Sequence, residues 1–291
     1  MRFMTSRGFC LTALCLGLAA QTPFSLAAQT AQQAQPAAQR QAPQQRQAIS
    51  PETLFSTMLV NAEKGQSQAM LTVALLYEQG IGTPRHFTKA LEWYGKAAKA
   101  GNSEAQYRLG VCYEIGVGTT ADMGKALEAY AKAASMGFAP AQYKLADIYL
   151  NGRGEPKDER KGFDFLSKAA QGGELAAMFD MGQVLRNGLF GHKADLEKAR
   201  QWYAKAADLG HAQSILALAD MLRNGQGGKA DPQGSLRWYL IGQKAGMSGE
   251  ALDAVIKDLR GKLSSAQAQE AEKAATAWIA DRASAQAGQR K

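Results

Sequence analysis

The sequence has few of the residues on which disulfide-bonded domains and β-sheets depend. Only 3 of its 291 residues are cysteine, and Val and Ile are scarce beside plentiful alanine and glutamine. So few cysteines exclude a disulfide-built scaffold, and few β-branched residues argue against a large buried sheet. The length allows one long domain or two ordinary ones.

The main body of the chain also lacks an excess of charge of either sign. The formal net charge is +8, but between residues 51 and 280 there are 27 Lys and Arg against 25 Asp and Glu. A domain that binds nucleic acid usually gathers basic residues on its folded surface. The sequence therefore predicts no nucleic-acid partner.

The first 27 residues have the order of segments found in a secretory signal peptide. Arg2 and Arg7 precede an uncharged apolar run from Gly8 to Ala20, too short for the ~20 residues that span a bilayer. Small residues at Ser25 and Ala27 predict cleavage after Ala27. We therefore expect a periplasmic or secreted protein with no transmembrane segment after cleavage; an uncleaved membrane anchor is the alternative.

Residues 28–50 predict a disordered linker. They contain glutamine, alanine and two prolines but hardly any large apolar side chain, so they cannot bury enough surface to offset the entropy of ordering. Folding is expected to begin at Ser50, which with Pro51 and Glu52 has the pattern of a helix N-terminus. An N-terminal capping helix is predicted over residues 51–66.

From residue 67 the chain repeats a unit of about 36 residues. LLYEQGIG at 75–82 matches VCYEIGVG at 111–118, and KALEWYGKAAKAG at 89–101 matches KALEAYAKAASMG at 125–137. Repetition at this period indicates a repeat architecture. The predicted units are residues 67–101, 102–137, 138–173, 174–210 and 211–246.

Each unit predicts two helices. The first helix places apolar or small residues at positions such as Ala69, Val73 and Leu76, whose spacing makes one buried stripe. A Gly-x-Gly turn follows, and the second helix ends at a glycine such as Gly101, a residue suited to a helix C-terminus. An aspartate two to three residues before each second helix predicts its N-terminal cap, with histidine as a weaker substitute in the first unit. These capping residues are His86, Asp122, Asp158, Asp195 and Asp231.

This pattern resembles the Sel1-like repeat family, a branch of the tetratricopeptide-like α-solenoids. The family pattern A-x-x-x-L-G-x-x-Y-x-x-G-x-G-V-x-x-D-x-x-K-A-x-x-W-Y-x-K-A-A-x-x-G is met almost letter for letter at residues 105–137. The resemblance covers residues 67–246 and implies an all-α solenoid of about five helix-turn-helix repeats, here in an exported bacterial member. Residues 247–285 resemble C-terminal capping helices, and residues 286–291 are expected to be a flexible tail.

The side chains that could carry chemistry predict structural roles instead. The Gly-x-Gly pairs follow no strand and carry no Lys-Ser/Thr, so they fit neither a dinucleotide site nor a P-loop. His86, His192 and His211 share no helix face, which argues against a metal site. Cys112 stands where the other units have Leu, Ile, Val or Met, so we expect a buried, unreactive thiol. We predict no catalytic, cofactor-binding or metal-binding residues and no enzymatic activity.

Two sets of equivalent positions on the second helices are predicted to have structural roles, one in the core and one at the solvent-exposed face. Trp93, Trp202 and Trp238 share a column with Ala129 and Phe165, as expected of core residues. Acidic and lysine residues four apart predict ion pairs that each stabilise a helix by about 0.2–0.5 kcal/mol. These pairs are Glu92/Lys96, Glu128/Lys132 and Asp164/Lys168.

One stripe on the first helices changes its chemistry from unit to unit. In tetratricopeptide-like solenoids the first helices line the concave surface, so the resemblance implies that this stripe faces a groove; plain solvent exposure is the alternative. The predicted partner-binding residues are Gln68, Arg108, Val111, Lys144, Asp147, Asp180, Gln183 and Asp220.

The resemblance and the missing catalytic motifs together predict a scaffold for protein–protein interaction in the bacterial envelope, with an envelope protein or peptide as partner and no cofactor. Two alternatives remain. Some cysteine-rich members of the family are described as β-lactamase-like hydrolases, but this chain lacks their paired cysteines and any Ser-x-x-Lys motif. A peptidoglycan-associated structural protein is the other.

Overall fold

A computed structural model describes residues 49–289, with side chains as far as residue 285, and residues from Ile49 onward form a unit of their own. The predicted signal peptide, most of the predicted linker and the last two residues lie outside this part. The described part contains 13 helices and no strand, which confirms the all-α fold.

After α1 (Pro51–Glu63), the chain forms five pairs of 13-residue helices and then two closing helices. The first helices of the pairs are α2 (Ser67–Gln79), α4 (Ser103–Ile115), α6 (Ala139–Asn151), α8 (Leu175–Asn187) and α10 (Ala212–Asn224). The second helices are α3 (Phe87–Lys99), α5 (Met123–Ser135), α7 (Glu159–Gln171), α9 (Leu196–Asp208) and α11 (Pro232–Lys244). The closing helices are α12 (Glu250–Lys262) and α13 (Ser265–Gln289).

The predicted caps form at the starts of the helices. Ser50 accepts a hydrogen bond from the backbone N–H of Thr53, and Asp122 accepts one from Lys125 at 3.0 Å. Each of the four predicted capping aspartates accepts a hydrogen bond from a backbone N–H in the first turn of its own helix. The imidazole Nδ1 of His86 accepts from the N–H of Lys89 at a longer 3.4 Å, as expected of a weaker cap.

The turn between the two helices of a pair packs directly onto the preceding second helix. Gly118 has φ +72°, and a Cβ added there would lie 2.5 Å from the carbonyl oxygen of Phe87. Both the backbone conformation and the close approach therefore require glycine. In the fourth pair, Phe190 occupies this position with φ +54°, so the predicted Gly-x-Gly turn is absent there. The one extra residue of that loop lies in the same turn.

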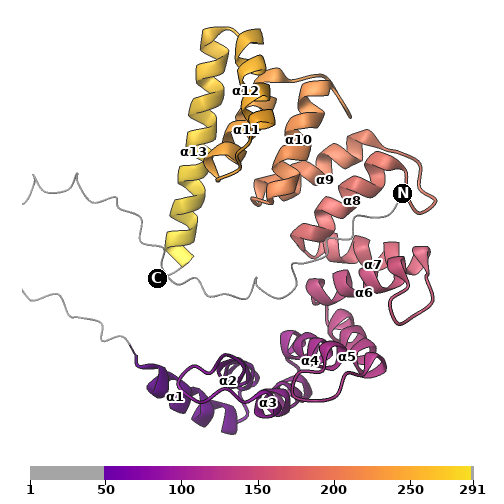
Figure 1. Cartoon of the computed structure of the whole chain (residues 1–291), viewed down its shortest axis with the longest axis vertical. Coiled ribbons are helices and arrows are strands. Elements are labelled where there is room, and N and C mark those ends of the chain that lie inside the picture. The colour runs from indigo at the N-terminus through magenta and orange to yellow at the C-terminus, as the bar shows by residue number, and fades with distance from the viewer. Residues whose placement is uncertain (1–48, 290–291) are drawn as a thin grey trace, which may run out of the picture. The chain divides into compact units, whose positions relative to one another are not determined.

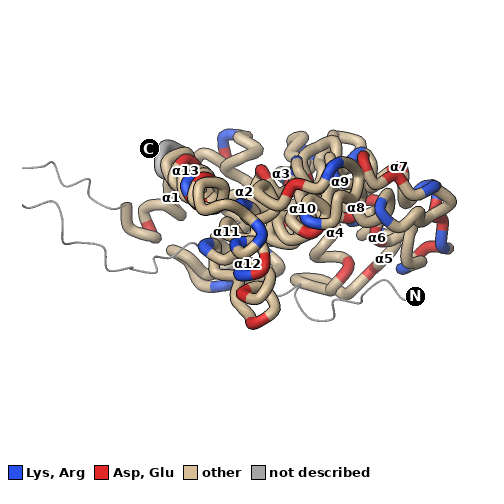
Figure 2. Tube along the Cα trace, turned by 90° about the horizontal axis from the view of Figure 1, so that it is seen from above, with Lys and Arg blue, Asp and Glu red and all other residues tan. Residues whose placement is uncertain are grey.

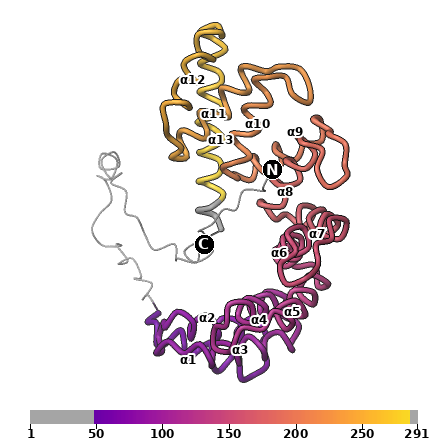
Figure 3. Tube along the Cα trace, turned by 45° about the vertical axis from the view of Figure 1, so that its right-hand side comes forward, coloured from indigo at the N-terminus to yellow at the C-terminus, as the bar shows by residue number. Residues whose placement is uncertain are grey.

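The helices pack on their neighbours in chain order, and α13 returns to pack on α11 (Figure 1). Within this unit α2, α4, α6 and α8 lie on the inner side of the curve that the pairs follow (Figure 3). Small residues let the two helices of a pair approach closely. A Cβ added to Gly110 would lie 2.7 Å from the Tyr130 ring, and one at Gly182 would lie 2.5 Å from the Tyr203 ring.

The predicted burial of Cys112 in the core is confirmed, because this thiol is 6% exposed among Leu71, Ala90 and Tyr94.

The predicted ion pairs along the second helices do not form among the described residues. Instead the ammonium of Lys96 lies 3.9 Å from the centroid of the Trp93 ring, and Lys168 and Lys205 lie over aromatic rings in the same way. In each case the lysine ammonium is attracted to an aromatic ring one helical turn away, and for Lys96 and Lys168 this ring replaces the carboxylate with which the sequence pattern pairs them.

The C-terminal end differs from the prediction in one respect. Residues 286–291 were expected to be a flexible tail, but α13 continues to Gln289. The last turns of α13 are rich in alanine and contain no proline, so nothing local ends the helix at residue 285.

Basic and acidic residues alternate along the described part without a region of one sign, as Figure 2 shows.

Candidate interaction surface

The eight predicted partner-binding residues lie on the five first helices, and we refer to them together as the first-helix surface. Gln68 is exposed and the other seven are half-buried. Nearly all of them bond to neighbouring side chains, so the surface is an organised network and not a row of free side chains.

A lysine–glutamate pair joins the first helices of the second and third units. Lys144 Nζ on α6 lies 2.8 Å from Glu114 Oε1 on α4, and the two side chains are 21% and 25% exposed. Glu114 also accepts a hydrogen bond from the hydroxyl of the buried Tyr130 at 2.5 Å. Arg108 is held within α4 by Glu104 at 2.9 Å. These pairs fix the position of both cations.

A tyrosine–aspartate pair joins the third and fourth units. The hydroxyl of Tyr143 on α6 donates to Asp180 on α8 at 2.8 Å. Burial raises the pKa of Asp180, the hydrogen bond from Tyr143 opposes this rise, and the charge of Asp147 adds to it. Asp147 pairs with Arg153 at 3.0 Å and accepts a hydrogen bond from Asn151 at 2.7 Å.

The remaining polar residues of the surface bond in the same manner. Gln183 accepts a hydrogen bond from Tyr203 at 2.7 Å, and Asp220 accepts one from Tyr239 at 2.5 Å. At the other end Gln68 accepts from Asn102, the cap of the next first helix, at 3.2 Å. Bonds within and between units therefore run the length of the surface.

The sequence argument missed the second half of this network. A tyrosine recurs at one position of the second helices, is buried, and donates its hydroxyl to a first helix. The recurrence was visible in the sequence, but an amphipathic pattern alone assigns such a residue to the core and gives no partner for its hydroxyl. The residues are Tyr94, Tyr130, Tyr203 and Tyr239, with Glu78 and Glu114 as acceptors in the first two units.

The cysteine of the described part is a protonated thiol. Burial, helped by the charge of Glu78, raises the pKa of the Cys112 thiol to about 12, so the thiol is protonated at neutral pH. Across residues 49–289 no group of His, Cys, Asp and Glu is placed to hold a metal ion. Within the same range no helix has both the length and the apolar character to cross a bilayer.

Helix pairs of constant length that pack each on the next along the chain define the α-solenoid class of repeat proteins. The profile of the Sel1 repeat matches residues 67–102, 103–138, 139–174, 175–211 and 212–242. The chain belongs to the Sel1 repeat family.

Two solved structures are similar to this chain, and the first agrees with the family assignment. A Sel1 repeat protein from Oxalobacter formigenes is 30% identical, with a TM-score of 0.59 over 67% of this chain and 79% of that one. The protective antigen c5321 of uropathogenic Escherichia coli, which has the same repeat fold, is 25% identical, with a TM-score of 0.48 over 79% of this chain and 56% of that one. No curated protein shows a significant match to the chain.

Proposed function

We propose that the protein is an exported scaffold that binds a protein or an extended peptide on its first-helix surface, in the periplasm or outside the cell. The observation that carries the proposal is the chain of bonds that holds polar side chains of successive first helices in place. Three of these bonds cross between units, Gln68 to Asn102, Lys144 to Glu114 and Tyr143 to Asp180.

Held side chains favour binding for an entropic reason. Each rotamer-rich side chain that an interface must immobilise costs about 0.5–1.5 kcal/mol. Lys144 and Arg108 are already fixed by Glu114 and Glu104, so a partner has less disorder to remove. Their charges then select the partner's charge pattern and orientation.

The test exchanges charges within the pairs. In the quadruple variant Lys144→Glu, Glu114→Lys, Arg108→Glu, Glu104→Arg, each ion pair keeps both signs and the net charge stays constant. We expect the variant to fold with a lower melting temperature, because the buried Tyr130 hydroxyl loses Glu114 as its acceptor, and to lose capture of the wild-type partner from envelope extract. A variant that captures the same partner equally well contradicts the use of this surface.

A matched control makes the same exchange elsewhere. Asp258 and Lys262 on α12 form an exposed pair at 2.7 Å, one turn apart. The double variant Asp258→Lys, Lys262→Asp should melt and bind as the wild type does. Loss of capture in this control would place the binding surface on the closing helices instead.

A further inference from the structure

The closing helix α13 forms one wall of a cleft at the C-terminal end of the unit. The cleft has a volume of about 610 Å³ and lies between α9 and α13, with α10 and α11 as its floor. At one end Arg282 of α13 closes the gap, because its guanidinium donates to the carbonyl oxygens of Asp208 and Leu209, both at 2.6 Å. The cleft is therefore a fixed feature of this end of the unit.

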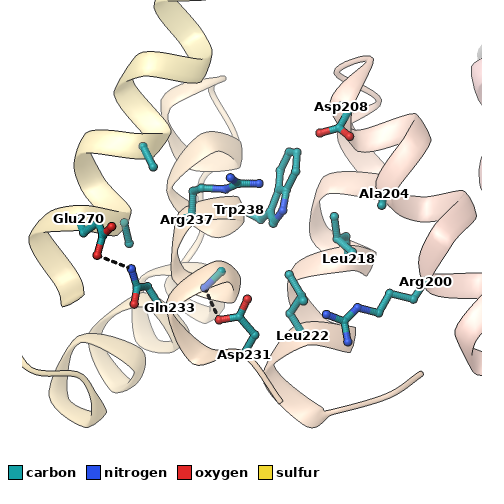
Figure 4. A pocket seen from close by; sticks show the side chains of 13 residues that line it. Arg200, Ala204, Asp208, Leu218, Leu222, Asp231, Gln233, Arg237, Trp238 and Glu270 are labelled. Atoms are coloured by element: carbon teal, nitrogen blue, oxygen red, sulfur yellow. Dashed lines mark hydrogen bonds between the residues drawn. The ribbon is translucent and has the colours of Figure 1, made fainter. Parts of the chain in front are cut away.

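At one equivalent position of the second helices, the residue changes from acidic in the first units to basic at this cleft. The residues are Glu92, Glu128, Asp164 and Gln201 along the chain, and then Arg237 where α13 supplies a wall. Figure 4 shows the Arg237 guanidinium extending from α11 beside the Trp238 ring, with Leu218 and Leu222 on the floor and Asp208 on the opposite wall. The guanidinium carbon lies 4.8 Å from the centroid of that ring.

Arg237 has an unused donor. Its Nε is buried and has no hydrogen-bond partner within residues 49–289. The nearby carboxylates Asp231 and Glu270 are already engaged, the first by the N–H of Gly234 at 2.8 Å and the second by the side-chain amide of Gln233 at 3.0 Å. The buried Nε lies out of reach of a ligand, but the two terminal nitrogens of the guanidinium make no hydrogen bond or ion pair with the described residues, and together they can donate two parallel hydrogen bonds to a carboxylate.

The floor of the cleft is apolar, and the opposite wall carries Asp208 together with Arg200, which donates to the carbonyl oxygen of Lys229 at 3.3 Å. Leu218, Leu222 and Ala271 are buried and Ala274 is half-buried. The carboxylate of Asp208 makes no hydrogen bond or ion pair with the described residues, so it is available to an N–H group. The cleft thus presents a cation, an apolar floor and an acceptor.

We propose that this cleft binds the C-terminal end of a peptide whose last side chain is apolar. The terminal carboxylate pairs with Arg237, the last side chain lies on Leu218 and Leu222, and a backbone N–H of the peptide donates to Asp208. This site is separate from the first-helix surface and does not depend on it.

The experiment uses the mature protein and three probes in isothermal titration calorimetry. N-acetyl-Ala-Ala-Leu with a free carboxylate should bind, and the same peptide with a C-terminal amide should bind about tenfold more weakly or worse, since a charge-assisted hydrogen bond is lost. 4-Methylpentanoate, which has the carboxylate and the apolar group but no N–H, distinguishes a simple carboxylic acid from a peptide end. It should bind more weakly than the peptide acid.

Arg237→Gln should weaken the peptide acid to the level of the amide. Arg160→Gln, which removes an exposed arginine on α7, is the control and should have no effect. Because Arg237 also contacts Trp238, a second variant, Ala274→Phe, fills the cleft without altering the arginine and should abolish binding. Melting temperatures of all variants show whether they are folded.

Four results would overturn the proposal. The first three are equal affinities for acid and amide, wild-type affinity in folded Arg237→Gln, and no saturable binding of any probe. If 4-methylpentanoate binds as tightly as the peptide acid, and Asp208→Asn weakens neither, the assignment to a peptide end is wrong.

Discussion

Replacing Gly118 with alanine should destabilise the protein through the turn that packs on α3. The left-handed backbone costs an L-residue about 1–2 kcal/mol, and the more restricted unfolded chain returns about 0.4–1 kcal/mol. The new Cβ would also lie 2.5 Å from the Phe87 carbonyl oxygen, so the loop must move away from α3. Such overpacking typically costs about 1–3 kcal/mol, and the total loss should be about 1–5 kcal/mol.

The matched control is Gly95→Ala in the middle of α3. Nothing lies within 4 Å of the Cβ that this change adds, and the helix has an ordinary backbone there. Alanine is the better helix former by about 0.8–1.0 kcal/mol, so this change should stabilise the protein. The same substitution is thus expected to act with opposite signs at two positions of one unit.

Urea and thermal unfolding, followed by circular dichroism, measure both effects. The midpoint should fall for Gly118→Ala and rise for Gly95→Ala. Equal or greater stability of Gly118→Ala would show that the turn does not rest on α3 as described, and the argument from close approach would be wrong.

Three further predictions concern the thiol, metals and the N-terminus. Burial raises the pKa of Cys112 to about 12 and that of Tyr203 to about 12, so above the ordinary pKa values near 9 and 10 the unfolded chain binds fewer protons than the folded one. The contribution of these two groups to the free energy of unfolding should therefore be fully present at pH 8 and be lost as the pH rises toward 12, which thermal melts at several pH values would show. A maleimide should label Cys112 only after unfolding. A chelator should leave the melting temperature unchanged and no β-lactam should be hydrolysed; chelator-sensitive turnover would favour the hydrolase alternative. Mass spectrometry of exported protein should find Ala28 at the N-terminus, and retention of Met1 would refute the predicted cleavage.

The sequence predicted the fold because its signals are local and occur five times. The caps at Asp122 and its equivalents and the apolar column that contains Cys112 follow from spacing within one unit. The interactions between units did not follow from it. The bond from Lys144 to Glu114 depends on how far one first helix is rotated against the next, and the residue spacing within one unit does not specify that angle.

The same limit explains the errors at the surface. Lys96 was assigned to Glu92 because helical spacing brings them together, but Trp93 is equally near and holds the ammonium instead. Phe190 could not be identified as a left-handed residue, because a longer loop has several ways to turn. The cleft beside α13 depends on where a non-repeating helix returns, and repetition gives no information on that.

The order of packing also affects how the protein unfolds. Most contacts join helices that are neighbours in the chain, so stability accumulates unit by unit and unfolding can begin at an end. The two ends are not equivalent. At the C-terminus Arg282 is bonded to a carbonyl 74 residues earlier, whereas α1 packs mainly on α2. Opening should therefore spread from α1 toward the C-terminus, and hydrogen exchange should be fastest in α1 and α2 and slowest in α9–α11.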